Sequence, residues 1–204
     1  MATTVSSRAR RLIAAIEATF AQRKPGEFGL DHVLALLEPL PPLTDEFTRS
    51  THSVTRHIGA ALQAGNESTA ALLEVVRPVI RFLRWRYSYR ARAGAGSLGD
   101  NVAFAELVGP EAPFRSDSVC LGLTLIAPAT LYPSHRHPAI ETYYVLAGTA
   151  IWTLDGVSRE NPPGTYILHP SQAVHSMQTH AEPLLAIYTW SGPDVRTPSV
   201  YTEA

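Results

Sequence analysis

The chain has 204 residues, of which 45% are hydrophobic, so it can bury one core with a helical appendage. Its formal net charge is -1, and no basic surplus indicates nucleic-acid binding. The single cysteine, Cys120, excludes a disulfide within the chain and is expected to be a small buried residue. No apolar run of about 18 residues predicts a membrane-spanning helix, so we expect a cytoplasmic protein without membrane partners.

The first part of the chain, up to residue 93, has the apolar spacing of helices. A first helix is expected after a cap at Ser6 or Ser7, and it ends before the Pro25-Gly26 pair. Three more are expected over about 31–38, 45–62 and 68–77. Their apolar stripes must be buried either on the rest of the chain or on a second subunit, and the latter would make a homodimer.

Residues 79–90 are rich in arginine and aromatic side chains. One interpretation is a nucleic-acid patch. The other is an amphipathic helix that packs Phe82, Trp85 and Tyr89 while its arginines are solvated or paired. We favour the helix, because the chain as a whole is not basic.

A stretch rich in glycine and alanine, 91–99, precedes a region of short strands. Strands are expected over 102–107, 119–126, 141–146, 150–154, 166–168 and 184–190. Turn residues such as Asp155-Gly156 separate them. Many short strands at this spacing predict an all-β barrel or sandwich. We therefore divide the chain into a helical region, 1–93, and a β-barrel, 94–204.

Histidine and glutamate recur at strand spacing in the predicted barrel. His135 and His137 are two residues apart, so on a strand both imidazoles point to one face. Glu141 and Tyr143 share a face of the following strand for the same reason. His175 comes after a proline turn and is a fourth candidate ligand. Three imidazoles and one carboxylate suit a divalent transition metal in a site with open positions.

This combination resembles the cupin superfamily. The first cupin motif is matched by His135, His137, Glu141 and Gly148, and the second by Gly164, Pro170 and His175. One departure is Gln172, where the second motif usually has glycine. The resemblance implies a mainly β fold, the double-stranded β-helix (jelly-roll) barrel. It also implies one metal ion, Fe²⁺ or Zn²⁺ before Mn²⁺, Ni²⁺ or Co²⁺, with His135 as the ligand most readily displaced.

The residues around these ligands narrow the resemblance. The run from Glu141 to Gly148, with Tyr132 before the histidines, is similar to the cupin lyases of dimethylsulfoniopropionate and to their DddQ branch. The resemblance implies that a metal binds the carboxylate of this zwitterionic small molecule and acts as a Lewis acid. It further implies that Tyr143 removes the proton beside the carboxylate, so that dimethyl sulfide leaves and acrylate remains. Tyr132 is the second candidate catalytic tyrosine.

The sulfonium end of such a substrate carries a positive charge without a hydrogen-bond donor, which suits aromatic faces. The candidate substrate-binding residues are Tyr132, Tyr188, Trp190 and Tyr201. Trp152 is expected to pack in the core, and the sequence leaves open whether Trp85 and Tyr89 close the barrel mouth. Two other functions use the same site: a cupin-type iron dioxygenase and a non-enzymatic small-molecule-binding cupin. Tyr143, in phase with Glu141, favours proton abstraction.

Overall fold

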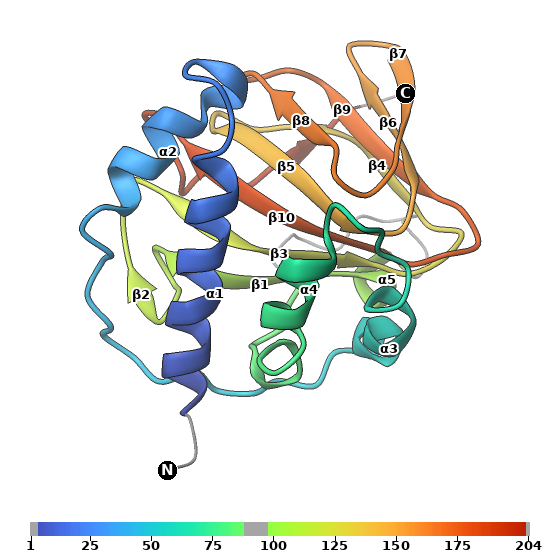
Figure 1. The fold of residues 1–204 in the computed structure, drawn as a ribbon. Helices are drawn as coiled ribbons and strands as arrows, with labels where there is room; N and C mark the ends of the chain where they lie inside the picture. The colour runs from blue at the N-terminus through green and yellow to red at the C-terminus, as the bar shows by residue number, and fades with distance from the viewer. Residues whose placement is uncertain (1–3, 88–97, 203–204) are drawn as a thin grey trace.

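The computed structural model describes residues 4–87 and 98–202, which form two β-sheets with helices along one side (Figure 1). The larger sheet has six strands in the order β2-β1-β3-β10-β5-β8, and the smaller has five in the order β11-β4-β9-β6-β7. Neighbouring strands are antiparallel except for β1 and β2. Two such layers make a jelly roll, so the predicted mainly β fold with an N-terminal helical region is confirmed.

The predicted strands are all present. The larger sheet contains β1 Val102–Gly109, β2 Phe114–Arg115, β3 Cys120–Ile126, β5 Ile140–Ala147, β8 Tyr166–His169 and β10 Leu184–Ser191. The smaller contains β4 Leu131–Arg136, β6 Ala150–Leu154, β7 Val157–Asn161, β9 His175–Thr179 and β11 Val200–Tyr201. The predicted Asp155-Gly156 turn joins β6 to β7 with φ angles of 46° and 82°, as a two-residue hairpin requires.

Most of three of the four predicted ranges is helical, as α1 Val5–Phe20, α2 Leu30–Leu37 and α4 Ala70–Val76. The shorter helical segments are η1 Glu27–Gly29, η2 Ser53–His57, α3 Ile58–Ala61, η3 Ile80–Phe82 and α5 Leu98–Asn101. The hydroxyl oxygen of Thr4 accepts the Ser7 backbone N–H at 3.2 Å and caps α1. The predicted cap at Ser6 or Ser7 is therefore wrong.

The helix predicted over 45–62 is wrong over most of its length. Only η2 and α3 are helical there, and residues 45–52 follow the barrel edge without a helix. The backbone N–H of Thr44 donates to Pro113 O at 2.9 Å, and Ser50 forms a β-bridge with Arg84. Hydroxyl side chains, frequent in this stretch, compete with helical backbone hydrogen bonds, so the apolar spacing overstated helicity.

The amphipathic helix predicted over 79–90 is also wrong. After η3 the chain is extended, and Arg86 pairs with Phe104 of β1 through backbone hydrogen bonds of 2.8 and 3.0 Å. Trp85 is buried as expected, but Phe82 is 41% exposed. Arginine and aromatic residues alternate from 84 to 87, which is the period of a strand. Tyr89 and most of the predicted linker, 91–97, lie outside the described residues.

The six-stranded sheet has a buried core on each face. The helix-side core lies between this sheet and the helices, and its members include Leu12, Ile16, Phe20, Leu121, Leu123, Tyr144 and Ile187. The barrel core lies between the two sheets, and its members include Phe104, Cys120, Tyr132, Tyr143, Trp152, Tyr188 and Trp190. Both faces of the central strands are therefore buried, as they are when helices cover a sheet.

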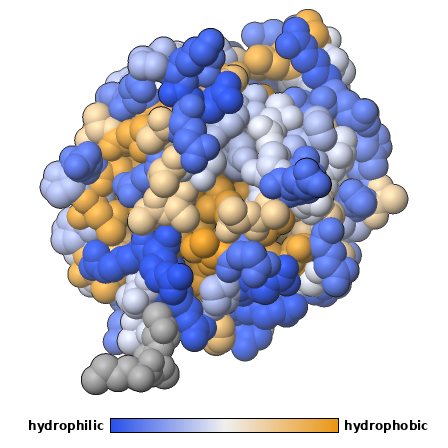
Figure 2. Space-filling view, viewed as in Figure 1, coloured by the Kyte–Doolittle hydropathy of each residue, from blue (hydrophilic) through white to orange (hydrophobic). Residues whose placement is uncertain are grey.

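The helical face is shown in Figure 2, where apolar side chains gather over the left and central parts among hydrophilic ones. These lie where α1, α2 and α4 cover the sheet in Figure 1. Within the described ranges, no helix combines the length and apolar character needed to cross a membrane.

Candidate metal centre and adjoining cavity

Three residues from separate strands meet at one buried point between the two sheets. His137 follows β4, Glu141 lies on β5 and His175 begins β9. Their ligand atoms all lie within 4.8 Å of one another, and no side chain of the three is more than 3% exposed. The fold thus brings together three of the four predicted ligand residues: His137 and Glu141 are four residues apart, and His175 lies 34 residues beyond Glu141.

Backbone carbonyls orient the imidazoles. Nδ1 of His137 donates to the carbonyl two residues ahead at 3.0 Å. His135 and His175 each donate from Nδ1 to the carbonyl two residues behind, at 2.7 and 2.9 Å. Because a carbonyl oxygen only accepts, each Nδ1 carries a proton, and Nε2 is the ring nitrogen left to bind a metal. This is the arrangement that holds a histidine ready as a metal ligand.

Glu141 is the centre of the polar contacts. Its Oε2 accepts hydrogen bonds from His137 at 3.2 Å and from His169 at 2.9 Å, and its Oε1 accepts from the Trp190 indole at 2.7 Å. Burial alone would raise the pKa of this carboxyl group. The charge of His137 and the hydrogen bonds of the histidines outweigh that effect and hold the pKa of Glu141 well below its usual value. The carboxylate is therefore anionic and suited to bind a cation.

The donor set fits a divalent transition metal. Nε2 of His175 is fully buried and 3.3 Å from Oε2 of Glu141, yet among the described residues it has no hydrogen-bond partner. An unpartnered buried nitrogen is costly unless something else binds it. A metal ion shared with Glu141 and His137 would satisfy that nitrogen, and mixed nitrogen and oxygen ligands suit iron, zinc, manganese, nickel or cobalt.

His135 lies beside this cluster rather than within it. Its ring centroid is 4.1 Å from that of His175 but 6.3 Å from that of His137. Tyr132 stacks on the His135 ring with centroids 4.2 Å apart. Burial and the neighbouring His175 lower the pKa of His135 to about 3, so the ring is neutral and able to ligate. Its role as a fourth ligand stays a prediction.

His169 belongs to the site although the cupin motifs do not mark it. This fully buried residue on β8 stacks on His175 with ring centroids 3.9 Å apart and donates from Nδ1 to Glu141. Burial lowers its pKa to about 4, against the opposing hydrogen bond to Glu141. The signal in the sequence was that His169 directly follows the strand predicted over 166–168 and lies six residues before His175.

Tyr143 and Tyr144 point to opposite faces of β5. Tyr143 is 1% exposed in the barrel core, where its ring lies 5.7 Å from His169 and 6.5 Å from Tyr188. Tyr144 packs in the helix-side core against Tyr166 at 4.5 Å. Strand parity therefore placed both residues correctly: Tyr143 is on the same side of the sheet as Glu141, and Tyr144 is not.

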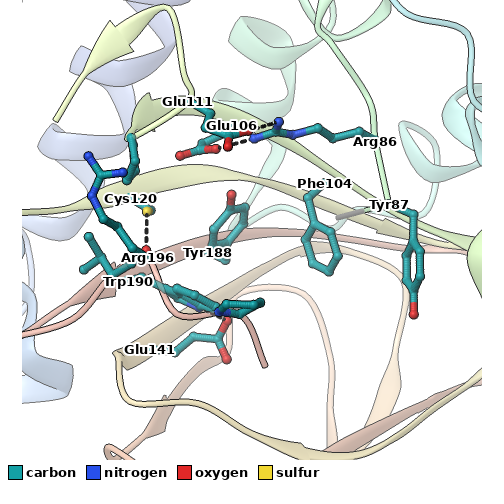
Figure 3. Close-up of a pocket in the computed structure, with 13 residues that line it drawn as sticks. Arg86, Tyr87, Phe104, Glu106, Glu111, Cys120, Glu141, Tyr188, Trp190 and Arg196 are labelled. Carbon is teal, nitrogen blue, oxygen red and sulfur yellow. Dashed lines mark hydrogen bonds and ion pairs between the residues drawn. The ribbon is translucent and has the colours of Figure 1, made fainter. Parts of the chain in front are cut away.

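A cavity of about 440 Å³ opens next to Glu141 (Figure 3). Among its lining residues, Tyr188 and Trp190 were predicted to bind substrate, whereas Tyr87, Phe104 and Glu106 were not singled out in the sequence. Phe104 and Glu106 are two residues apart on a predicted strand, so their side chains share a face. This spacing is the signal by which the sequence could have indicated them together. Tyr87 comes from the segment that was expected to be helical.

The other predicted aromatic residues have different positions. Tyr132 is 1% exposed and lies deeper in the barrel core, between Phe104 and His135. Tyr201 pairs with His135 across β11 and β4, and its hydroxyl hydrogen-bonds to that of Tyr87. Trp152 packs in the core as expected. Trp85 packs in the helix-side core and donates its indole N–H to a backbone carbonyl at 3.0 Å, so it does not close the barrel mouth.

Comparisons with known proteins concern the family and the fold of the chain. A family model described as dimethylsulfoniopropionate lyase matches residues 29–186. The chain is 34% identical to dimethylsulfoniopropionate lyase DddQ of Ruegeria pomeroyi over 120 residues, which are 58% of this chain and 59% of that protein. It is 30% identical to a protein named DddL of Cereibacter sphaeroides over 165 residues, 80% of this chain and 69% of that one.

The solved structures extend the match over the whole fold. A crystal structure of DddQ from Ruegeria pomeroyi superposes with a TM-score of 0.82 at 27% identity and covers 96% of each chain. The superposed 96% of this chain includes parts of both the helical region and the barrel. Because the family model spans residues 29–186, more than half of the sequence, the chain belongs to the dimethylsulfoniopropionate lyase family.

Proposed function

We propose that this protein is a metal-dependent carbon–sulfur lyase that cleaves dimethylsulfoniopropionate to dimethyl sulfide and acrylate. The observation that carries the proposal is the buried His137–Glu141–His175 cluster beside an aromatic cavity, with Tyr143 on the same face of β5 as Glu141. Family membership supports the substrate, since the named relatives are lyases of this compound.

The proposed metal ligands are His137, Glu141 and His175, with His135 as the fourth. A divalent transition metal held there would supply a Lewis acid for the substrate carboxylate and an electrostatic field that favours the tyrosinate form of a nearby phenol. The anionic Glu141 and the imidazoles of His137 and His175, whose Nδ1 atoms are held by backbone carbonyls, are what this chain provides for such an ion.

The proton transfer is assigned to Tyr143. Its phenolate oxygen takes a proton from the carbon beside the carboxylate, and the electron pair of that C–H bond becomes the second bond of the new double bond. The C–S bond breaks at the same time, and its electron pair leaves on dimethyl sulfide. The products are acrylate, dimethyl sulfide and a protonated Tyr143, so atoms and charge balance. A positioned general base of this kind typically contributes about 10²- to 10⁴-fold to the rate.

Aromatic side chains are proposed to hold the other end of the substrate. Tyr188 and Trp190 line the cavity next to Glu141 and present ring faces to a cation that has no hydrogen-bond donor. Tyr132, stacked on His135, is the second candidate for the proton step. Tyr201 contributes through its hydrogen bond to Tyr87, which also lines the cavity.

The test is to incubate the protein, loaded in turn with iron, zinc, manganese, nickel and cobalt, with dimethylsulfoniopropionate. Headspace dimethyl sulfide and dissolved acrylate are expected in equal amounts. His175→Ala should lose both metal and activity, whereas His180→Ala should keep both, because His180 is an exposed histidine paired with Glu160. Failure of every metal form to release dimethyl sulfide would overturn the proposal, and oxygen uptake with another substrate would support a dioxygenase instead.

A further inference from the structure

One row of residues crosses the six-stranded sheet from the proposed base to a carboxylate. The strand register pairs Tyr143 of β5 with Tyr188 of β10, Tyr188 with Gly122 of β3, and Gly122 with Glu106 of β1. Phe104, two residues before Glu106 on the same strand, belongs to the barrel core. Glu106 therefore faces the interior of the barrel, and it lines the cavity at the end away from Glu141 (Figure 3).

Gly122 makes this row continuous. A Cβ atom at Gly122 would lie 2.6 Å from Cε1 of Tyr188 and 2.6 Å from the carbonyl oxygen of Ala105. The tyrosine ring thus occupies the space that any larger residue on β3 would fill. It lies across β3, with its hydroxyl toward the side where Glu106 and Cys120 lie (Figure 3). An aromatic surface therefore runs from the proposed base toward the carboxylate of Glu106.

The carboxyl group of Glu106 is held in place by an ion pair with Arg86. Its side chain is only 13% exposed, and its Oε2 lies 3.0 Å from Nη2 of Arg86. Burial raises the pKa of Glu106 above its usual value, and the charge and hydrogen bond of Arg86 offset part of that rise. Arg86 also pairs with Glu111, so two carboxylates share one guanidinium. Arg196, the other arginine that lines the cavity, pairs with Asp117.

The geometry points to Glu106 as the residue that selects a cationic leaving group. This inference rests on the proposed function, in which the substrate carboxylate lies at the His137–Glu141–His175 cluster and Tyr143 removes a proton from the adjacent carbon. The sulfur is two bonds from that carbon, whereas neighbouring strands are about 4.8 Å apart. A sulfonium group would therefore lie over Tyr188, one strand from the base and on the side of Glu106.

A sulfonium group cannot donate a hydrogen bond, so a protein distinguishes it from a neutral group of the same shape only by charge. The ring of Tyr188 supplies part of this discrimination. A buried carboxylate beyond the ring supplies more, because charges in a partly buried site are screened much less than in water. At the distance of about two strands, one unit charge is expected to change the preference for a cation by roughly tenfold.

The experiment compares two inhibitors of the same shape. One is β-alanine betaine, which has a trimethylammonium group in place of dimethylsulfonium. The other is its carbon isostere, in which a tert-butyl group replaces trimethylammonium. Dissociation constants for both are measured by calorimetry with metal-loaded protein. We expect wild-type protein to bind the betaine at least tenfold more tightly than the isostere, and Glu106→Gln to reduce this ratio by about tenfold.

Two further variants make the result decisive. Glu111→Gln is the matched control, because this side chain shares Arg86 but is 68% exposed, and the ratio should change less than about twofold. Glu106→Met is a second neutral variant, with an apolar side chain of similar length that suits the barrel core. It should also reduce the ratio by about tenfold, so it decides the question if Glu106→Gln fails to fold. A wild-type ratio near one, or an unchanged ratio in Glu106→Gln, would overturn the inference.

The outcomes also separate this inference from the proposed reaction. If no dimethyl sulfide is released but the betaine preference is present and depends on Glu106, the cavity selects cations and the assigned chemistry is wrong. If dimethyl sulfide is released and the ratio is insensitive to Glu106, the reaction stands and the selection by Glu106 is rejected.

Discussion

The two cores on either face of the six-stranded sheet are built from the same strands but differ in chemistry. The helix-side core is almost wholly aliphatic and aromatic, with α1 packed on the sheet through Leu12, Ile16 and Phe20. The barrel core contains tyrosine and tryptophan side chains together with the buried polar residues His135, His137, Glu141, His169 and His175. Alternate positions on one strand therefore serve either stability or the site.

Buried polar atoms without a hydrogen-bond partner also distinguish the barrel core from the helix-side core. Among the described residues they belong to the barrel half of the chain, namely Thr124, Trp152, His169, His175 and Thr202. Leaving such atoms unpaired costs about 1–3 kcal/mol each, which a fold optimised only for stability would avoid. The helix-side core bears no such cost, so it can offset the cost of a site that keeps nitrogen lone pairs available.

The largest effect on kcat is expected when one of two adjacent tyrosines, which point to opposite faces of β5, is replaced by phenylalanine. Tyr143→Phe removes the proposed base and is expected to lower kcat by about 10³-fold. Tyr144→Phe changes the helix-side core only and should leave kcat within about twofold. Both variants should retain full metal content by elemental analysis. Equal losses of kcat in the two variants would mean that the hydroxyl of Tyr143 has no special role, and Tyr132 would be tested next.

Much of this comparison could be predicted from the sequence, because it depends on local spacing. The alternation along β5 placed Tyr143 with Glu141 and Tyr144 away from them. The parts that could not be predicted depend on contacts between distant segments. Arg86 is extended because its backbone pairs with that of Phe104. The hydrophobic spacing within 79–90 carries no information about a partner that lies outside this range.

The lining of the cavity could be predicted from the sequence only in part, for the same reason. The sequence indicated Tyr188 and Trp190, which lie near the C-terminal end of a clear strand, but not Tyr87, Phe104 or Glu106. The alternation of Phe104 and Glu106 was visible, yet which face of that strand lines the site depends on its register with β3 and β10. Register between strands is set by long-range packing, so a single sequence does not determine it.

The helix-side core should carry stability without chemistry. Leu12 is 0% exposed on the buried face of α1, so Leu12→Ala leaves a cavity and should lower the free energy of unfolding by about 3–4 kcal/mol. Urea denaturation measures this loss, and kcat per folded molecule should not change. A parallel fall in kcat under conditions where the variant is folded would show that the helices influence the site.

Acid should destabilise the metal-free protein through the barrel core. The pKa values of His135 and His169, about 3 and about 4, lie below the unfolded value of 6.5, so between pH 6.5 and 4.5 the unfolded chain binds more protons. Stability must then fall as pH falls, by at most about 2.7 kcal/mol per pH unit for two histidines.

Two neighbouring titratable residues, His137 and Glu141, do not alter the expected fall in stability between pH 6.5 and 4.5. His137 has a raised pKa and is protonated in both states below pH 6.5, while Glu141, with its lowered pKa, loses its contribution only below about 4.5. Urea titrations in the presence of a chelator measure the slope. His169→Asn keeps a donor near Nδ1 and should remove about half of it, and a flat profile for wild-type protein would show that these rings are charged when buried.

The smallest effect is expected at Gln172, in the turn that carries His175. Its φ of 64° is left-handed, which favours glycine, while its backbone N–H donates to the carbonyl of His137 at 2.9 Å. Gln172→Gly relieves the strain, keeps that hydrogen bond and should raise the free energy of unfolding by about 0.5–1 kcal/mol. Ala129→Gly, at a φ of 50° away from the cluster, is the matched control and should stabilise similarly. If Gln172→Gly weakens metal binding and Ala129→Gly does not, the stiffness of the turn positions His175. The strained residue then lowers the stability of the barrel core but maintains the geometry of the site.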